Sequence, residues 1–458
     1  MFKSLSLSEL IEPLAAVLHG ADAEFGALNT DSRKITPGQL FVALRGDFFD
    51  GHRYLADVAQ RGAVAAVVEE YQADIDLPQL CVADTRIALG RIALLNRAQF
   101  TGPTVAVTGS SGKTTVKEML ASICRHALGE TAVLATRGNL NNELGVPFTL
   151  LELNAQHRAA VVELGASHPG EIAYTAALTQ PQVAVISNAG MAHAGEFGGP
   201  EHIILAKGEI LDGLGSEQTA VLNLDDAAFA QWRERNRQCQ VLSFSTRRSD
   251  ADIYASAIVS NAQGRMGFNL HGVAGECFIQ LAVLGLHNVS NALAAVAAAH
   301  ALNIPLAAIK QGLEGLKAIS GRSVVYECAG HVQIIDDSYN ANPASIRAAI
   351  DVLQNMPGQR VLVLGDMGEL GEWAEQEHAH IGVYANGKVD AVFATGPLMQ
   401  HAVAQYCGVS GHFLTQNSLI EALLTQVSGP ATFLIKGSRG AAMEYVVSAL
   451  RTSLGDAL

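Results

Sequence analysis

TVAVTGSSGKTT, residues 104–115, is the most informative segment of this chain for its architecture. A run of apolar and β-branched residues ends in a turn that carries Gly109 and Gly112, and helix-compatible residues follow. This order of strand, glycine-bearing turn and helix is the context that a phosphate-binding loop requires. The glycines let backbone N–H groups approach phosphate oxygens, and the helix N-terminus adds partial positive charge. The stretch therefore predicts a nucleotide-binding α/β domain.

The polar residues of this loop have distinct expected tasks. Lys113 reaches the β- and γ-phosphates of ATP, and the Thr114 hydroxyl is offered to Mg²⁺. The common pattern has Gly where this chain has Val107, so the match is to the shorter GxxGKT form. The alternative is a glycine-rich turn with an incidental lysine. The predicted ATP contacts in the loop are Gly109, Ser110, Ser111, Gly112, Lys113, Thr114 and Thr115.

Short β-rich runs alternate with helical stretches downstream of the loop. Three of these runs end at turns or polar clusters: AAVVELG, VAVISN and TAVLNL. The same alternation begins again after Leu316, with the runs VQIIDD, RVLVLGD, AVFATG and ATFLIKG. Such alternation predicts parallel strands joined by helices. Shorter runs with polar alternation at 252–280 predict an antiparallel region appended to the first sheet. A helix is expected at 290–302.

The 458 residues are enough for about three domains of roughly 150 residues each. A helical pattern at 84–99 leads sharply into the phosphate-loop segment, which places the first boundary near residue 100. The fold class is α/β. We predict a small α/β N-terminal domain (1–99), a central P-loop domain with a parallel sheet and the antiparallel region (100–315), and a C-terminal doubly wound, Rossmann-like domain (316–458).

Composition excludes several classes of function. Charged residues make up 16% of the chain and hydrophobic residues 49%, which is typical of a compact protein rather than a disordered one. Asp and Glu total 44 against 30 Lys and Arg, so the net charge of −14 argues against nucleic-acid binding. The six cysteines form no CxxC or Cys/His cluster, and neither a zinc site nor a disulfide framework is indicated.

Location and assembly follow from the apolar segments. The N-terminal sequence lacks the pattern of an export signal, and the alanine-rich run at 292–302 is too short to span a bilayer. We therefore expect a cytoplasmic protein with no membrane insertion. A monomer is expected, because no long apolar stripe is left unexplained.

Several segments resemble the ATP-dependent Mur ligases of bacterial cell-wall synthesis and their relative, folylpolyglutamate synthase. NLNNELGVP (139–147) accompanies the phosphate loop as in that family, and DSRKITPGQLFVALRGDFFDGH (31–52) resembles its uridine-nucleotide domain. GLHNVSNALAA (285–295) is similar to the adenine-contacting segment, and DDSYNANP (336–343) to the opening of the C-terminal domain. LGDMGELG (364–371) resembles the member that adds D-alanyl-D-alanine to UDP-N-acetylmuramoyl-tripeptide.

This resemblance implies an ADP-forming ligase with ATP and two Mg²⁺ ions. The carboxylate of UDP-N-acetylmuramoyl-tripeptide attacks the γ-phosphate, and the amine of D-alanyl-D-alanine then attacks the acyl phosphate. The product is the UDP-N-acetylmuramoyl-pentapeptide precursor of peptidoglycan. Lys113, Arg322 and the metal ions neutralise and align the charges. Closure of three domains around the site is expected.

The resemblance also implies a metal site. Glu163 ends one predicted strand and His193 follows another, so both are expected at the carboxyl edge of one sheet. Alone, each would be an ordinary strand-end or loop residue, but AHAGEFG resembles the family's metal-binding AHLExFG segment, with Ala194 and Gly195 replacing the usual residues. Lys207 alone would be a solvated helix lysine, whereas the family's lysine at this place is carbamylated. The expected catalytic residues are Lys113, Lys207, His193 and Glu163, and the metal ligands are Thr114, Glu163, His193 and Lys207 as its carbamate.

Further residues are assigned to nucleotide and substrates by the same resemblance. Asn291 would contact adenine, with an N-cap as the alternative, and Arg322 and Asp337 would contact phosphate and ribose or Mg²⁺, with surface ion pairs as the alternative. Ordinary turn chemistry is the alternative for most of the others. The expected contacts are Asn288 for ATP; Ser32, Arg33, Arg45 and Gly46 for the uridine diphosphate; Asn141 and Asn142, in a loop between helical segments, for sugar or pyrophosphate; and Tyr339, Asn340, Asn342, Lys436, Ser438 and Arg439 for D-alanyl-D-alanine.

Two other functions stay open at this point. One is a sibling ligase that adds a single amino acid, but its DNPR-type motif is absent and DDSYNANP occupies the comparable region. The other is a P-loop regulator or motor, which would hydrolyse ATP without forming an amide.

Overall fold

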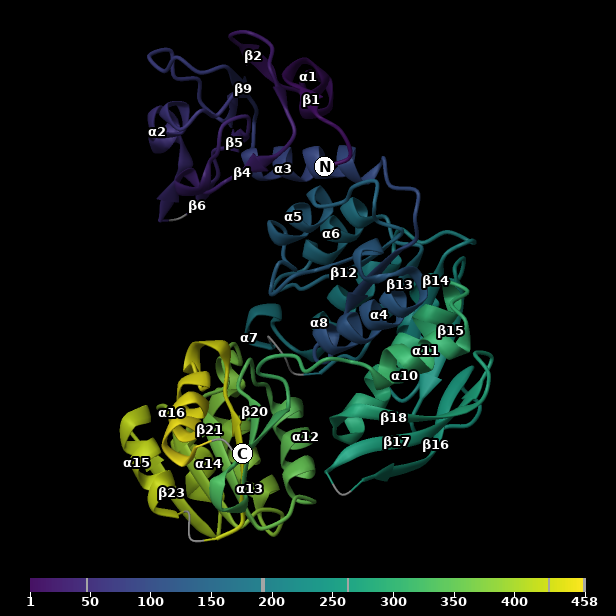
Figure 1. The fold of residues 1–458 in the computed structure, drawn as a ribbon, viewed down its shortest axis with the longest axis vertical. Helices are drawn as coiled ribbons and strands as arrows, with labels where there is room; N and C mark the ends of the chain where they lie inside the picture. Colours follow the sequence, from purple (N-terminus) through teal and green to yellow (C-terminus); the bar gives the residue numbers. More distant parts are fainter. Residues whose placement is uncertain (47, 191–193, 262, 427–428, 456–458) are drawn as a thin grey trace. The chain divides into compact units, whose positions relative to one another are not determined.

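A computed structural model of the chain describes residues 1–46, 48–190, 194–261, 263–426 and 429–455 (Figure 1). By its internal contacts the chain divides into two compact units. The first consists of Met1–Ala106, Glu130–Leu164 and Ala173–Pro181, and the second of Val107–Gly129, Gly165–Ile172 and Gln182–Leu458. None of the helices in the described part of the chain combines the length and hydropathy that a membrane crossing requires.

The N-terminal sheet belongs to the first unit and has the strand order β2-β9-β8-β5-β4. Its middle strands, LFV and AAVV, are buried along their whole length, as parallel strands covered on both faces require. The pair β2/β9 is antiparallel and the other pairs are parallel. The strands are β2 (Val17–His19), β4 (Leu28–Asn29), β5 (Leu40–Val42), β8 (Ala65–Val68) and β9 (Gln79–Cys81), and the helices are α1 (Leu7–Leu14), α2 (Leu55–Gln60) and α3 (Thr85–Arg97).

Short elements complete this region. The helix expected at 84–99 is confirmed as α3, which begins where the Asp84 side chain accepts hydrogen bonds from the N–H groups of Arg86 and Ile87. Two small antiparallel pairs and two 3₁₀ helices lie outside the sheet. They are β1 (Leu5–Ser6) with β3 (Glu24–Phe25), β6 (Arg45–Gly46) with β7 (Phe49–Asp50), η1 (Ser32–Lys34) and η2 (Gly51–Tyr54).

A nine-stranded sheet has the order β11-β12-β10-β13-β14-β15-β16-β17-β18. The four strands expected from TVAVTG, AAVVELG, VAVISN and TAVLNL are confirmed as β10, β12, β13 and β14, and each is buried at every residue. The strands are β10 (Thr104–Thr108), β11 (Val133–Ala135), β12 (Ala159–Glu163), β13 (Val183–Ile186), β14 (Thr219–Asn223), β15 (Gln240–Ser245), β16 (Ile253–Ser260), β17 (Arg265–Gly272) and β18 (Cys277–Leu284).

The predicted antiparallel extension is also confirmed, since β16, β17 and β18 pair antiparallel in sequence order. The helix expected at 290–302 begins earlier, because the turn at Gly285 already starts α10. The helices of this region are α4 (Lys113–Leu128), α5 (Gly145–Leu151), α6 (Glu171–Thr179), α7 (Ala194–Phe197), α8 (Pro200–Gly208), α9 (Phe229–Arg235), α10 (Leu286–Ala301) and α11 (Leu306–Glu314), with the 3₁₀ helices η3 (Glu130–Ala132) and η4 (Glu209–Leu211).

The C-terminal sheet has the order β19-β20-β24-β21-β22-β23, with only the pair β19/β20 antiparallel among these described strands. Its strands are β19 (Val324–Cys328), β20 (Val332–Asp337), β21 (Gln359–Gly365), β22 (Ala391–Thr395), β23 (Val409–Phe413) and β24 (Ala431–Lys436). Its helices are α12 (Pro343–Leu353), α13 (Ala374–Ala385), α14 (Met399–Gln405), α15 (Gln416–Gln426) and α16 (Glu444–Leu454), with η5 (Ala329–His331), η6 (Gly371–Trp373) and η7 (Arg439–Ala441).

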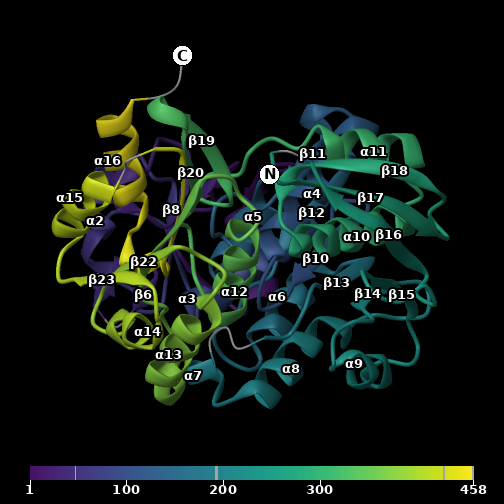
Figure 2. The ribbon, with the colours of Figure 1, turned by 90° about the horizontal axis from the view of Figure 1, so that it is seen from below.

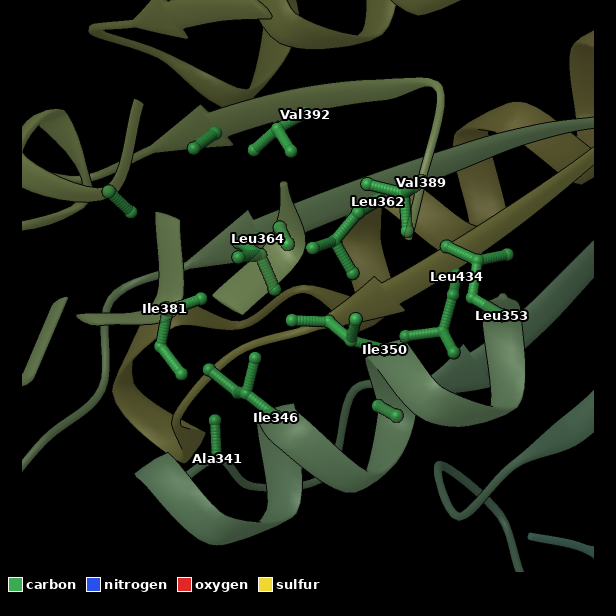
Figure 3. Close-up of a cluster of buried hydrophobic side chains, with 14 of the residues drawn as sticks. Ala341, Ile346, Ile350, Leu353, Leu362, Leu364, Ile381, Val389, Val392 and Leu434 are labelled. Atoms are coloured by element: carbon green, nitrogen blue, oxygen red, sulfur yellow. The ribbon is translucent and has the colours of Figure 1, made fainter. Parts of the chain in front are cut away.

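Helices cover both faces of this sheet (Figures 1 and 2). Alternate residues of one strand enter different cores: Leu362 packs with Ile346 and Ile350 of α12, whereas Val363 packs in the cluster that holds Leu423 of α15. Figure 3 shows the first of these clusters. The doubly wound C-terminal region and the α/β class are therefore confirmed.

Candidate active site

The phosphate loop joins the buried strand β10 to helix α4, which begins at Lys113. Gly109 has φ +145° and Gly112 has φ +81°, values that residues with a Cβ rarely adopt. A Cβ at Gly109 would lie 2.0 Å from Ser187 Oγ, and one at Gly112 would lie 2.3 Å from Asn291 Oδ1. Both glycines are therefore required by the backbone path and by close neighbours. Lys113 Nζ donates to the Gly109 carbonyl oxygen at 2.7 Å, so the lysine folds back over the loop.

A cavity of about 220 Å³ opens beside this loop within the second unit. Its lining comes from the loop, from the start of α10 and from segments next to β20 and β24. The structure thus brings together predicted nucleotide residues that are far apart in sequence. Those that line the cavity are Ser111, Gly112, Thr115, Asn288, Asn291, Arg322 and Asp337. Lys436, which was predicted to contact D-alanyl-D-alanine, lines the same cavity.

Asn288 and Asn291 are both buried on the first turns of α10. Asn288 Nδ2 donates to the Leu284 carbonyl oxygen at 2.7 Å, and Asn291 Nδ2 donates to Asn288 Oδ1 at 2.9 Å. Asn291 is inside the helix, so the N-cap alternative is wrong. Its side chain is held by Asn288 toward the cavity wall that Gly112 also forms.

Arg322 and Asn342 bond to hydroxyl groups of the phosphate loop. Arg322 Nη2 donates to Thr114 Oγ1 at 2.9 Å, and Asn342 Nδ2 donates to Ser111 Oγ at 2.9 Å. The guanidinium carbon of Arg322 lies 4.4 Å from the centre of the Tyr339 ring. Arg322 makes no ion pair with another described residue, so the surface-pair alternative fails for it. A guanidinium at the loop suits a developing phosphate charge.

Lys436, which is buried, and Asp337, which is partly buried, form an ion pair, with Lys436 Nζ 2.6 Å from Asp337 Oδ2. The ammonium also donates to the carbonyl oxygens of Asn340 at 2.8 Å and of Asp337 at 3.4 Å. Asp337 Oδ1 accepts from the Ser323 N–H at 3.0 Å. The alternative of a surface ion pair is therefore correct in that Asp337 forms an ion pair, but wrong in that this pair is not exposed.

Lys207 is 1% exposed, so the alternative of a solvated helix lysine is wrong. The neighbouring Leu205 is 47% exposed, so the helix presents the opposite face from the one its sequence suggests. Lys207 Nζ has no hydrogen-bond partner among the described residues and lies 5.1 Å from the centre of the Phe197 ring. Burial, reinforced by the positive charge of Lys113, lowers the pKa of Lys207 to about 7.

Glu163 at the end of β12 is 2% exposed, so the solvated alternative is wrong for it too. Its Oε1 accepts from Asn141 Nδ2 at 2.8 Å, and its N–H donates to Thr136 Oγ1 at 2.9 Å. Oε2 is buried and finds no partner among the described residues. A buried carboxylate oxygen without a partner suits a hard cation such as Mg²⁺.

His193 lies outside the described residues. Among the residues that are described, no cluster of three or more His, Cys, Asp and Glu side chains could hold a metal ion. Gly195, two residues after His193, contacts the LGDMGELG segment: its N–H donates to the Glu369 carbonyl oxygen at 3.1 Å. A Cβ at Gly195 would lie 2.5 Å from the Gly371 nitrogen. Gly195, which replaces the family's usual residue, therefore packs directly against Gly371 of LGDMGELG, and a Cβ at position 195 would not fit there.

Two of the predicted uridine contacts, Arg33 and Arg45, form local ion pairs within the first unit. Ser32 and Arg33 form η1, and Arg33 Nε lies 2.9 Å from Asp31 Oδ1. The Arg33 hydrogen bond lowers the pKa of Asp31 to about 2. Arg45, beside Gly46 in β6, lies 3.2 Å from Glu70 and 3.4 Å from Glu69. Turn and ion-pair chemistry accounts for these residues without a ligand.

Asn141 and Asn142 lie between strand β11 and helix α5, not between two helical segments as expected. Asn141 donates to Glu163, and Asn142 Oδ1 accepts from the Gly145 N–H at 2.8 Å. This loop therefore carries one residue that orients the candidate metal carboxylate and one that starts a helix.

The remaining residues predicted to contact D-alanyl-D-alanine lie at one edge of the C-terminal sheet. Asp337 and Lys436 are register partners at the carboxyl ends of β20 and β24, and the loops after those strands carry the other predicted dipeptide contacts. The Ser438 N–H donates to the Asp366 carbonyl oxygen at 2.9 Å, whereas Arg439 is exposed and pairs with Glu444 at 2.9 Å. Asn340 Oδ1 accepts from the N–H of Ala341.

Two residues that support the phosphate loop were not predicted from the sequence. Asn188 lines the cavity, and Ser187 touches the loop beneath it. The available signal was the position of both residues at the carboxyl end of the predicted strand VAVISN, where ligand-binding loops of α/β sheets occur.

The chain belongs to the Mur ligase family. The Mur ligase middle domain matches residues 107–299, the Mur ligase glutamate ligase domain matches residues 321–439, and the Mur ligase family catalytic domain matches residues 24–98. The expected resemblance is therefore confirmed.

Individual relatives carry one activity in their names. The UDP-N-acetylmuramoyl-tripeptide–D-alanyl-D-alanine ligase of Escherichia coli K12 is 44% identical over 451 residues, which is 98% of each chain. MurF from Acinetobacter baumannii superposes with a TM-score of 0.93 at 39% identity, covering 98% of this chain and 99% of that one. The MurF ligase from Thermotoga maritima, solved in complex with ADP, has a TM-score of 0.85 at 28% identity, covering 93% and 97%.

Proposed function

We propose that this protein is the ATP-dependent ligase that joins D-alanyl-D-alanine to UDP-N-acetylmuramoyl-tripeptide. The reaction passes through an acyl phosphate and yields ADP, phosphate and the UDP-N-acetylmuramoyl-pentapeptide precursor of peptidoglycan. The observation that carries this function is the identity of 44% with a named ligase over 98% of both chains. The cavity at the phosphate loop supplies a place for the nucleotide.

The nucleotide is assigned to the second unit. The adenine lies against Asn288 and Asn291, and the phosphates meet residues 109–115 at the start of α4. Lys113 and Arg322 both carry a positive charge at the loop, and Thr114, now bonded to Arg322, presents its hydroxyl to a metal ion. Asp337 is assigned to the ribose or the metal shell.

In the first unit, Glu163 Oε2 is buried without a described hydrogen-bond partner, which suits a magnesium ligand. In the second unit, Lys207 Nζ is likewise buried without a described partner. Bound Mg²⁺ would neutralise charge on the phosphates and on the attacking carboxylate. We assign Thr114, Glu163, His193 and Lys207 as the residues that hold it. Asn141 fixes the orientation of the Glu163 carboxylate.

Lys207 is assigned a carbamate. A lysine reacts with CO₂ only as the neutral amine, and a site without a counter-charge in contact with the nitrogen favours that form. The N–C bond forms as the amine attacks CO₂, and the proton released leaves to water. The negative carbamate then complements Lys113 and the metal.

The three predicted domains take one reactant each. The N-terminal domain binds the uridine diphosphate through Ser32, Arg33, Arg45 and Gly46, and Asn141 and Asn142 contact sugar or pyrophosphate. The C-terminal domain binds the dipeptide carboxylate through the loops that carry Tyr339, Asn340, Asn342, Lys436, Ser438 and Arg439. We place the enzyme in the cytoplasm and expect it to be a monomer.

Phosphate release is the test of this function. Release must require ATP, UDP-N-acetylmuramoyl-tripeptide and D-alanyl-D-alanine together, and mass spectrometry must detect the pentapeptide product. Lys113→Ala should abolish turnover while the protein stays folded, because the ammonium assigned to neutralise the phosphate charge is lost. Release from ATP alone, without an amide product, would instead indicate a P-loop motor or regulator.

A further inference from the structure

The segment that follows strand β13 lies directly against the phosphate loop. The Ser187 N–H donates to the Thr108 carbonyl oxygen at 3.0 Å, and the Ser110 N–H donates to the Asn188 carbonyl oxygen at 3.0 Å. The Ser110 hydroxyl lies 3.0 Å from the Gly190 carbonyl oxygen and 2.9 Å from the Gly190 nitrogen. The first half of the loop therefore rests on this segment.

The Asn188 side chain pairs with both backbone groups of Ser111. The Ser111 N–H donates to Asn188 Oδ1 at 3.0 Å, and Asn188 Nδ2 donates to the Ser111 carbonyl oxygen at 2.9 Å. One carboxamide thus imitates the double pairing that a neighbouring strand gives to a residue. Holding both groups at once restricts rotation of the peptides on either side of Ser111.

The segment is itself anchored from behind. Asn223 Nδ2, at the end of β14, donates to the Ser187 carbonyl oxygen at 3.2 Å, and the Ala189 N–H donates to Asp226 Oδ2 at 2.8 Å. Ser187 Oγ also donates to the Ser111 carbonyl oxygen at 2.6 Å. Asn188 therefore acts from a fixed platform rather than from a freely moving loop.

This pairing decides which N–H groups face the nucleotide. The N–H groups of Ser110 and Ser111 are both bonded to Asn188. Phosphate oxygens are then directed to the N–H groups from Gly112 onward. That is the first turn of α4, where N–H groups lack acceptors within the helix and the helix dipole is positive.

We infer that Asn188 is a positioning residue for the nucleotide: its side chain holds the Ser111 peptide so that the start of α4, and not the middle of the loop, grips the phosphates. This role rests on the proposed function, because it presumes that ATP occupies the loop. Asn188 acts through the backbone of Ser111, and contact with the reacting atoms is not required.

Calorimetric titration of the full-length protein with Mg-ADP tests this role without turnover. Asn188→Ala removes two hydrogen bonds to the loop, and the Kd for ADP should rise about tenfold or more. Asn236→Ala is the matched control. Asn236 Nδ2 donates to the carbonyl oxygens of Leu211 at 2.7 Å and Leu214 at 2.8 Å, so it also bridges backbone segments, but it does not line the nucleotide cavity. The Kd of the Asn236→Ala variant for ADP should stay within about twofold of that of the unmodified protein.

Asn188→Asp separates positioning from packing. The carboxylate keeps the shape and the acceptor for the Ser111 N–H, but it opposes the Ser111 carbonyl oxygen and adds negative charge near the phosphates. Positioning predicts a Kd at least as high as that of N188A, whereas a packing role predicts recovery. An unchanged Kd in N188A, or recovery in N188D, would overturn the inference. Failure of the unmodified protein to bind ADP would count against the proposed function instead.

Discussion

Two buried lysines of the second unit, Lys436 and Lys207, differ in their partners. Lys436 is 4% exposed and Lys207 is 1% exposed, so burial does not distinguish them. Lys436 has a carboxylate at 2.6 Å and a carbonyl oxygen at 2.8 Å, whereas Lys207 Nζ has no hydrogen-bond partner among the described residues. The first ammonium is satisfied and links the ends of two strands.

The difference shows that a buried charge takes its role from the groups around it. A paired ammonium stays charged and holds structure, although its desolvation cost is repaid only while the partner remains. An unpaired one shifts toward the neutral amine, and for Lys207 the pKa falls to about 7 because of burial and of Lys113. The four predictions below test this contrast.

Removing the satisfied lysine should have the largest effect on stability. Lys436→Met leaves the Asp337 carboxylate without its ammonium, and we expect the free energy of unfolding to fall by about 3 kcal/mol in urea titrations of the ligand-free protein. Asp337→Asn combined with Lys436→Met removes both charges and should recover most of the loss. An equal loss in the double variant would show that the ion pair is not the cause.

Removing the unsatisfied lysine should instead damage activity. Lys207→Met should lower kcat by about 10²-fold or more, because the metal ligand proposed at this position would be lost, while urea stability does not fall. Lys317→Met, at an exposed lysine of the same unit, is the control and should leave both quantities unchanged. Electron density that ends at the Lys207 amine in a well-ordered, metal-bound crystal would refute the carbamate.

The pH dependence of stability should sharpen the contrast. Between pH 7 and 10.5 the unfolded chain keeps a proton on Lys207 that the folded protein has released, so stability rises with pH across this window. Below pH 7 Lys207 is protonated in both the folded and the unfolded state, so burial of the ammonium then lowers the free energy of unfolding most. The gain in Tm from Lys207→Met should therefore be larger at about pH 6 than at about pH 9 in metal-free, CO₂-free buffer. A gain independent of pH would contradict the assignment of the shift to burial.

The smallest effect on stability is expected for an exposed cation. Arg33 pairs with Asp31, but its side chain is 83% exposed, so Arg33→Ala should leave the unfolding midpoint unchanged. Binding of UDP should weaken about tenfold in the same variant if Arg33 contacts the diphosphate. Unaltered UDP affinity would remove Arg33 from the proposed substrate site.

Features encoded in contiguous stretches could be predicted. The phosphate loop, the strands β10 and β12 to β14, the antiparallel extension and the doubly wound C-terminal sheet all follow from runs of a few residues and their turns. The family segments gave the activity for the same reason. The start of α10 was placed too late because the residues after Gly285 look like a turn, although they are already helical.

Features that depend on distant neighbours could not be predicted. In α8 the local sequence alone left a solvated Lys207 as an alternative, and the structure buries this lysine. The support that Asn188 gives to Ser111 joins segments that are far apart along the chain. Nothing near either residue in the sequence signals its partner.

The α/β architecture, the phosphate loop and the family can be read from local sequence, because strand and helix patterns and a nucleotide loop are encoded in adjacent residues. Only the folded structure reveals which lysine is paired, which carboxylate oxygen of Glu163 lacks a partner among the described residues and which asparagine supports the loop. These depend on burial and hydrogen bonding, which arise only when segments remote in the chain are packed together.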